Sequence, residues 1–79
     1  MKDVMQWFDN SNKPLAQIVQ EGADYYKKTH SGPPNYCLVH PDMFDGDEKE
    51  LDVSFMGVTI KVRQYRPVLP PYLWIGLEG

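Results

Sequence analysis

The chain has 79 residues, 42% of them hydrophobic and 24% charged, which predicts one small folded domain over residues 1–79 rather than a disordered chain. Its formal net charge of −3 disfavours a general nucleic-acid binder, because such proteins gain affinity by neutralising phosphates. A single cysteine excludes an intrachain disulfide framework, and no apolar run approaches the roughly 20 residues that span a bilayer. Since the N-terminus also lacks a signal-peptide pattern, we expect a cytoplasmic protein that does not enter a membrane.

A short helix is predicted at the N-terminus. Val4, Met5 and Phe8 fall at helical spacing, which indicates one apolar helix face. The turn-forming residues at positions 9–12 then end this helix.

The main helix is predicted over residues 13–30. Within it, apolar side chains and one glycine recur at the spacing of a single helix face: Leu15, Ile18, Val19, Gly22 and Tyr26. Asn12 is the expected N-cap, and the SGPP segment at residues 31–34 ends the helix. Because Gly22 lies on the apolar face, where glycine lowers helix propensity, it indicates a close approach of the helix to a sheet.

The remainder of the chain predicts strands. Residues 36–40 (YCLVH) form an apolar run between two turn signals. Apolar residues then take odd positions in 51–55 and even positions in 58–62, so a turn or bulge is required near Gly57. A last strand is predicted over residues 72–78, where both faces are apolar, which indicates a central place in the sheet or cover by a partner.

The order of these elements favours an α+β fold. Too few residues separate the strands for helical crossovers between them. We therefore expect one main helix, at about residues 13–30, packed on a small, largely antiparallel sheet of three to four strands. The short N-terminal helix would be an addition to this arrangement.

The segment CLVHPDMFDGDEKE raises the question of a reactive or metal site. Residues three apart on a strand point to opposite faces, so Cys37 and His40 are not expected to form a nucleophile and base pair, and Cys37 is predicted to be buried. His40, Asp42 and Asp45 have metal-ligand side chains, but their spacing matches no established metal motif. A solvated acidic loop is favoured, and the alternative is a metal-binding protein or small hydrolase-type enzyme that uses His40 and the nearby aspartates.

One strand carries a basic face. Lys61, Arg63 and Tyr65 are predicted to share that face, with Arg66 beside them, and an ordinary solvated surface is the simplest interpretation. A basic face with an aromatic side chain also suits an acidic protein partner or a single-stranded nucleic acid. The negative net charge favours the protein partner and leaves the single-stranded nucleic acid as an alternative.

The C-terminal segment combines prolines with aromatic side chains, which is typical of a stiff recognition surface. No motif for catalysis, for phosphate binding or for a dinucleotide is present, so no catalytic residue and no cofactor is assigned. The sequence favours a binding protein over an enzyme, acting through contacts with an unknown protein partner or as a homodimer. The candidate binding residues are Lys61, Arg63, Tyr65, Arg66, Tyr72 and Trp74.

Overall fold

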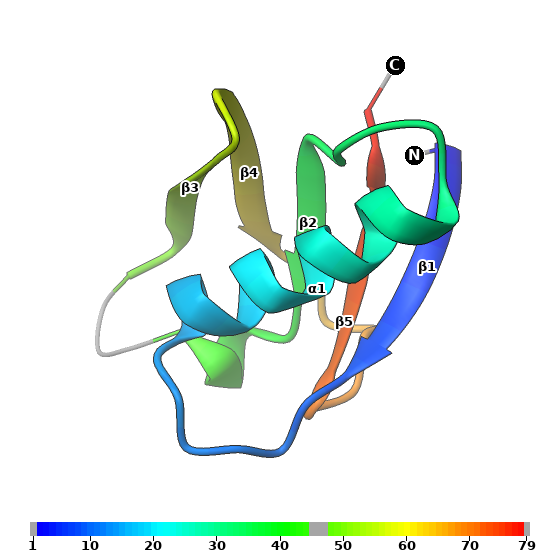
Figure 1. Cartoon of the computed structure of the whole chain (residues 1–79). Coiled ribbons are helices and arrows are strands. Elements are labelled where there is room, and N and C mark those ends of the chain that lie inside the picture. Colours follow the sequence, from blue (N-terminus) through cyan, green and yellow to red (C-terminus); the bar gives the residue numbers. More distant parts are fainter. Residues whose placement is uncertain (1, 45–47, 79) are drawn as a thin grey trace.

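The computed structural model describes residues 2–44 and 48–78, which form one sheet, one α-helix and a short 3₁₀ helix (Figure 1). In chain order the elements are β1 (Lys2–Phe8), α1 (Leu15–Thr29), β2 (Tyr36–Val39), the 3₁₀ helix η1 (Pro41–Met43), β3 (Glu50–Phe55), β4 (Val58–Gln64) and β5 (Tyr72–Leu77). No helix within the described ranges is long and apolar enough to cross a membrane. The predicted α+β class is confirmed.

The sheet has five strands in the order β1-β5-β2-β4-β3. Three of the four neighbouring pairs are antiparallel, and β2 with β4 is parallel. The prediction of three to four strands in a largely antiparallel sheet was therefore wrong in the strand count and missed the parallel pair. It was also wrong to exclude helical crossovers, because α1 connects β1 to β2, which lie on opposite sides of β5.

The predicted N-terminal helix is a strand instead. Met5 and Trp7 pack against the core under α1, whereas Val4 and Phe8 lie on the other face and are exposed. Because both faces of β1 carry large apolar side chains, the alternation is hidden, and three of these residues also fit a helical spacing. The pairing of Met5 with Ile75 and of neighbouring residues along β5 decides the outcome, and this pairing joins the two ends of the chain.

The main helix matches its prediction closely, since α1 covers Leu15–Thr29. Its start differs, because Pro14 is the N-cap and no side chain caps the first turn, so Asn12 does not serve as the N-cap. The helix lies across the sheet and packs against β3 and β5 (Figure 1). A Cβ on Gly22 would overlap Ile75 Cδ1 and lie 3.0 Å from Trp7 Cδ1. The close approach predicted at Gly22 is confirmed.

The change in apolar parity after Phe55 arises from a two-residue hairpin loop. Phe55 pairs with Val58, so Met56 and Gly57 alone connect β3 to β4. Both loop residues have positive φ, 51° and 79°, as a type I′ turn requires. An even-numbered loop places odd residues of β3 opposite even residues of β4, and both sets therefore face the helix.

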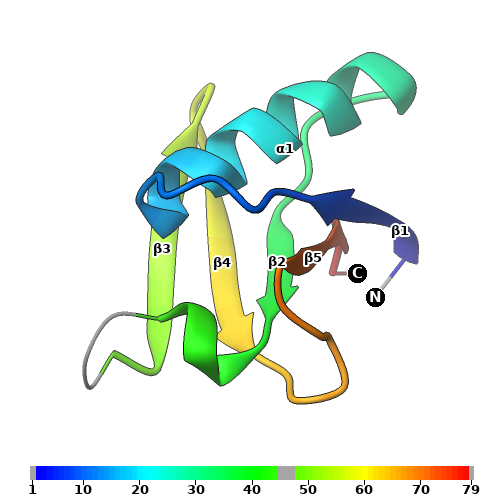
Figure 2. The ribbon, with the colours of Figure 1, turned by 90° about the horizontal axis from the view of Figure 1, so that it is seen from below.

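The core lies between α1 and one face of the sheet. Its buried side chains are Ile18, Val19, Ala23, Tyr26, Cys37, Val39, Phe44, Val53, Ile60, Val62, Leu73 and Ile75. β5 is hydrogen-bonded on both sides, to β1 and β2, so it is an inner strand of the sheet, and its second apolar face points away from α1. The sheet is twisted, and the strands change direction progressively from β3 to β1 (Figure 2).

The sheet face that points away from α1 is called the open face below. Within residues 2–44 and 48–78 the only α-helix lies on the other side, so no helix covers this face (Figures 1 and 2). Every second residue of each strand points to it. The open face is therefore the largest surface on which strand side chains meet solvent.

The tight contact at Gly22 predicts that Gly22→Ala lowers the free energy of unfolding by about 1–3 kcal/mol, because overpacking outweighs the roughly 1 kcal/mol gain in helix propensity. Ile75→Val removes the Cδ1 atom that a Cβ would meet. In that background the cost of Gly22→Ala should fall by about 1 kcal/mol or more, measured by urea unfolding of the four proteins in a double-mutant cycle. Equal costs in both backgrounds would contradict the contact.

The positive φ of Met56 predicts that the hairpin is strained at this position, since the left-handed conformation costs most residues about 1–2 kcal/mol and asparagine less. Met56→Asn should therefore be more stable than Met56→Ala by about 0.5–1 kcal/mol in thermal or urea unfolding. The alanine variant is the matched control, because both changes remove the contact of Met56 Sδ with Lys27 Nζ at 3.2 Å. Equal stability of the two variants would argue against a left-handed residue 56.

Candidate functional site

The strand register aligns two rows of side chains across the open face. One row runs over Gln6, Trp74, Leu38, Arg63 and Glu50, one residue from each strand. The second row runs over Gly76, Tyr36, Lys61 and Asp52. Apolar and aromatic side chains lie over β1, β5 and β2, while the charged ones lie over β4 and β3.

Aromatic side chains gather on the apolar half of the open face. We call Phe8, Tyr36, Tyr65, Tyr72 and Trp74 the aromatic patch. The ring centroids of Tyr65 and Trp74 are 5.7 Å apart, and those of Phe8 and Tyr72 are 5.1 Å apart with an edge-on geometry. Phe8 is 53% exposed and Tyr65 42%. Such exposure is high for side chains that gain 1 kcal/mol or more from burial.

The structure brings most of the candidate binding residues together. Five of the six lie on the open face: Lys61, Arg63, Tyr65, Tyr72 and Trp74. Arg66 lies in the turn after β4, exposed and beyond the strand. The grouping of Lys61 with Arg63 follows from strand alternation alone, whereas the meeting of Tyr65 with Trp74 requires β2 between β4 and β5.

Several residues of the open face are not among the six candidate binding residues predicted from the sequence. Phe8 was assigned to a helix, and Tyr36 and Leu38 were treated only as parts of an apolar strand. Strand alternation could have placed Tyr36 and Leu38 on this surface. Cys37 and Val39 are fully buried, so the residues that alternate with them must face the other side of the sheet. Val4 joins them from β1.

A shallow hollow of about 520 Å³ lies in the middle of this region. The lining is apolar over β1, β2 and β5 and becomes polar toward β4 and the C-terminus. The lining residues are Val4, Tyr36, Leu38, Arg63, Gln64, Tyr65, Trp74 and Glu78. A mainly apolar hollow with a few polar groups at its rim is the usual form of a recognition site.

The positive charge of Arg63 is paired with carboxylates of β3 and is therefore less available to a ligand than the sequence indicates. Its Nη1 donates to Asp52 Oδ1 at 3.1 Å, and its Nε lies 3.5 Å from Glu50 Oε2. Nη1 also donates to the backbone carbonyl oxygens of Val62 and Leu51. The side chain is 25% exposed and points toward β3, so the two carboxylates balance the guanidinium.

His40 has a structural role at the start of η1. Its Nδ1 accepts a hydrogen bond from the backbone N–H of Asp42 at 3.0 Å, which caps the 3₁₀ helix. Asp42 Oδ2 lies 3.6 Å from the same nitrogen. No group of three metal-ligating side chains occurs among the residues that the structure describes, and Asp45 lies outside them. Of the three candidate metal ligands, the structure therefore describes only His40 and Asp42, which meet in the cap of η1.

Cys37 belongs to the core. Its side chain faces α1 and is fully buried, and this burial raises the pKa of the thiol. His40 follows three residues later in an extended chain and caps η1, so the two side chains do not form a pair. The predicted burial of Cys37 is confirmed.

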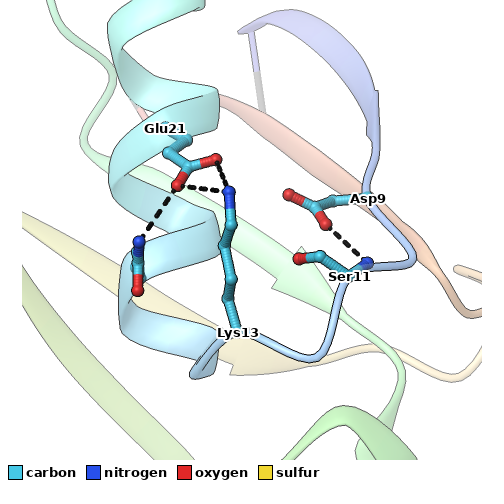
Figure 3. A network of polar contacts seen from close by, with 5 residues as sticks. Asp9, Ser11, Lys13 and Glu21 are labelled. Atoms are coloured by element: carbon cyan, nitrogen blue, oxygen red, sulfur yellow. Dashed lines mark hydrogen bonds and ion pairs between the residues drawn. The ribbon is translucent and has the colours of Figure 1, made fainter.

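The loop between β1 and α1 borders a second hollow, of about 580 Å³. Here Lys13 Nζ donates to both carboxylate oxygens of Glu21 at 2.9 Å, and Asp9 Oδ1 accepts from the backbone N–H of Ser11 at 2.9 Å (Figure 3). The hydrogen bonds from Ser11 lower the pKa of the Asp9 carboxyl. Because Lys13 is paired with Glu21 of α1 and Asp9 with Ser11 of the loop, these charged groups stabilise the connection into α1 and are not free to bind a ligand.

The buried thiol predicts that Cys37 in the native protein reacts with a disulfide reagent at least about 100-fold more slowly than in the urea-unfolded protein at the same pH. The reagent can reach the thiol only when α1 separates from the sheet. The reaction rate should therefore rise as the urea concentration approaches the midpoint of unfolding. Absorbance of the released thiolate measures it. Rapid stoichiometric labelling of the native protein would show that Cys37 is accessible.

Comparison of the chain with protein-family models, with curated proteins and with solved structures found no match.

Proposed function

We propose that this protein is an interaction module that binds another protein surface through the open face of its sheet. The observation that carries the proposal is the aromatic patch. Four of the large apolar side chains that are exposed within the described residues lie on this one face: Val4, Phe8, Tyr65 and Tyr72. Clustered exposed apolar groups with a polar border mark protein contact surfaces.

The chemistry of the patch suits protein recognition. Tyrosine and tryptophan bring large contact areas at low cost in side-chain entropy, and such residues dominate the binding energy of many interfaces. Trp74 is half-buried, its cross-strand neighbours are Gln6 and Leu38, and its ring centroid lies 5.7 Å from that of Tyr65, so its surroundings restrict the ring. A side chain that is ordered before binding loses little freedom when a partner arrives.

Charge favours a protein over a nucleic acid as the partner. Single-stranded nucleic acid would need the positive charge of Arg63 and Lys61, but Glu50 and Asp52 pair with Arg63, and Asp52 lies opposite Lys61. The chain as a whole has a net charge of −3. Binding to phosphates would therefore face repulsion, whereas a largely apolar protein contact would not.

The positions of His40 and Cys37 favour binding over catalysis. His40 Nδ1 already accepts the hydrogen bond that caps η1. Cys37 is buried on the face of β2 that points toward α1. A hydrolytic or metal site would need these groups to be free and to converge. A protein contact through the aromatic patch requires neither His40 nor Cys37.

A photo-crosslinking experiment tests the proposal. The photoreactive residue p-benzoylphenylalanine is introduced in place of Tyr65 in cells that produce the protein, and crosslinked products are separated by mass. We expect adducts from position 65, because it borders the contact surface. The matched control replaces Tyr25, which is 49% exposed on α1, compared with 42% for Tyr65. Equal or weaker crosslinking at position 65 than at position 25 would show that the open face is not a binding surface.

A further inference from the structure

We infer that the partner on the open face is a second copy of this chain, so that two molecules pack sheet to sheet around Trp74. This inference rests on the proposed function of the open face as a protein contact surface. A twofold pair buries the same patch on both molecules, so each patch must be complementary to itself in charge and in shape. Area, charge, shape and the state of the sheet edges each support this arrangement.

The open face has the area that a stable dimer needs. Five strands about 4.8 Å apart and about 20 Å long project onto roughly 500 Å², and protruding side chains raise the accessible area above that value. A standard protein interface buries about 800 Å² on each partner. One face of this sheet therefore approaches a complete interface without help from α1 or the loops.

The charged side chains of β3 and β4 on the open face balance one another. Lys61 and Arg63 on β4 lie across from Asp52 and Glu50 on β3. Glu78, at the rim of the hollow, adds one negative charge to this face, so most of the chain's net charge of −3 lies on other surfaces. Two copies can approach through this face with less repulsion than their equal net charge would produce elsewhere.

The open face also carries both parts of a self-complementary shape. The hollow of about 520 Å³ is lined by Tyr36, Leu38 and Trp74, among others. Phe8 and Tyr72 project from the same face, with 53% and 40% of their surfaces exposed. In a twofold pair the projecting rings of one copy can enter the hollow of the other, and the reverse contact forms at the same time.

The two edges of the sheet are less suited to self-association. β1 has a bulge between Lys2 and Met5, where Asp3 adopts a φ of 49°, and such irregularity interrupts pairing with a further strand. On the β3 edge, Gln20 Nε2 donates to the carbonyl oxygen of Ser54, and the strand carries two carboxylates, Glu50 and Asp52. Contact through the open face is therefore favoured over edge pairing.

Light scattering on the purified chain from about 5 to about 500 µM tests the inference. We expect twice the monomer mass at the higher concentrations, with a dissociation constant in the micromolar range. Tyr65→Lys should weaken the association at least about tenfold, because it buries a cation in the contact. Tyr25→Lys makes the same change on α1 and should leave the dissociation constant unchanged.

Circular dichroism and a thermal melt establish that each variant is folded, and Val4→Asp replaces Tyr65→Lys if the latter does not fold, since Val4 is 43% exposed at the hollow. A chain that stays monomeric to about 500 µM would overturn the inference. So would a dimer that Tyr65→Lys and Tyr25→Lys weaken equally, because the contact would then lie elsewhere.

The crosslinking experiment separates the two proposals. Adducts from position 65 with twice the mass of one chain support both the contact surface and the second copy. Adducts only with a different protein, from a chain that is monomeric in light scattering, would overturn self-association and support the interaction function. Crosslinking at position 65 no stronger than at position 25 would overturn the interaction function itself.

Discussion

The contact of α1 with β5 at Gly22 sets the distance between the two layers of the molecule. Because this position has no Cβ, the helix backbone comes close to the sheet, and Ile75 and Trp7 pack directly beneath it. β5 is in turn hydrogen-bonded to β1 and β2, so this contact fixes the helix, a central strand and an edge strand together. A 15-residue helix is about 22 Å long and covers one face of the sheet, which leaves the other face to solvent.

The two sheet faces therefore differ in chemistry as well as in cover. The helix side is mainly aliphatic and closely packed, whereas the open face combines aromatic rings with paired charges. Tyrosine and tryptophan can keep their polar groups in water while their rings remain available for contact. Changes on the open face therefore alter the chemistry of an exposed surface with little effect on the core.

The parts predicted from the sequence are those that depend on local spacing. The main helix, the turn at Gly57 and the shared face of Lys61 and Arg63 all follow from periodicities within a few residues. β1 was missed because both its faces are apolar and its partner β5 lies at the far end of the chain. The pairing of Arg63 with carboxylates was missed for a similar reason, since it depends on which strand lies beside β4.

The insertion of β5 between β1 and β2 affects the order in which the fold can be assembled. Ribosomes release a chain from its N-terminus, so β1 and β2 emerge before Tyr72–Leu77, and in the finished sheet they are not neighbours. Until β5 emerges, β1 has no strand to pair with and one edge of β2 is open. Exposed strand edges favour association between unfinished chains and attract chaperones. The sheet therefore cannot be complete until β5 has been synthesised, whereas α1 and the β3–β4 hairpin precede it along the chain.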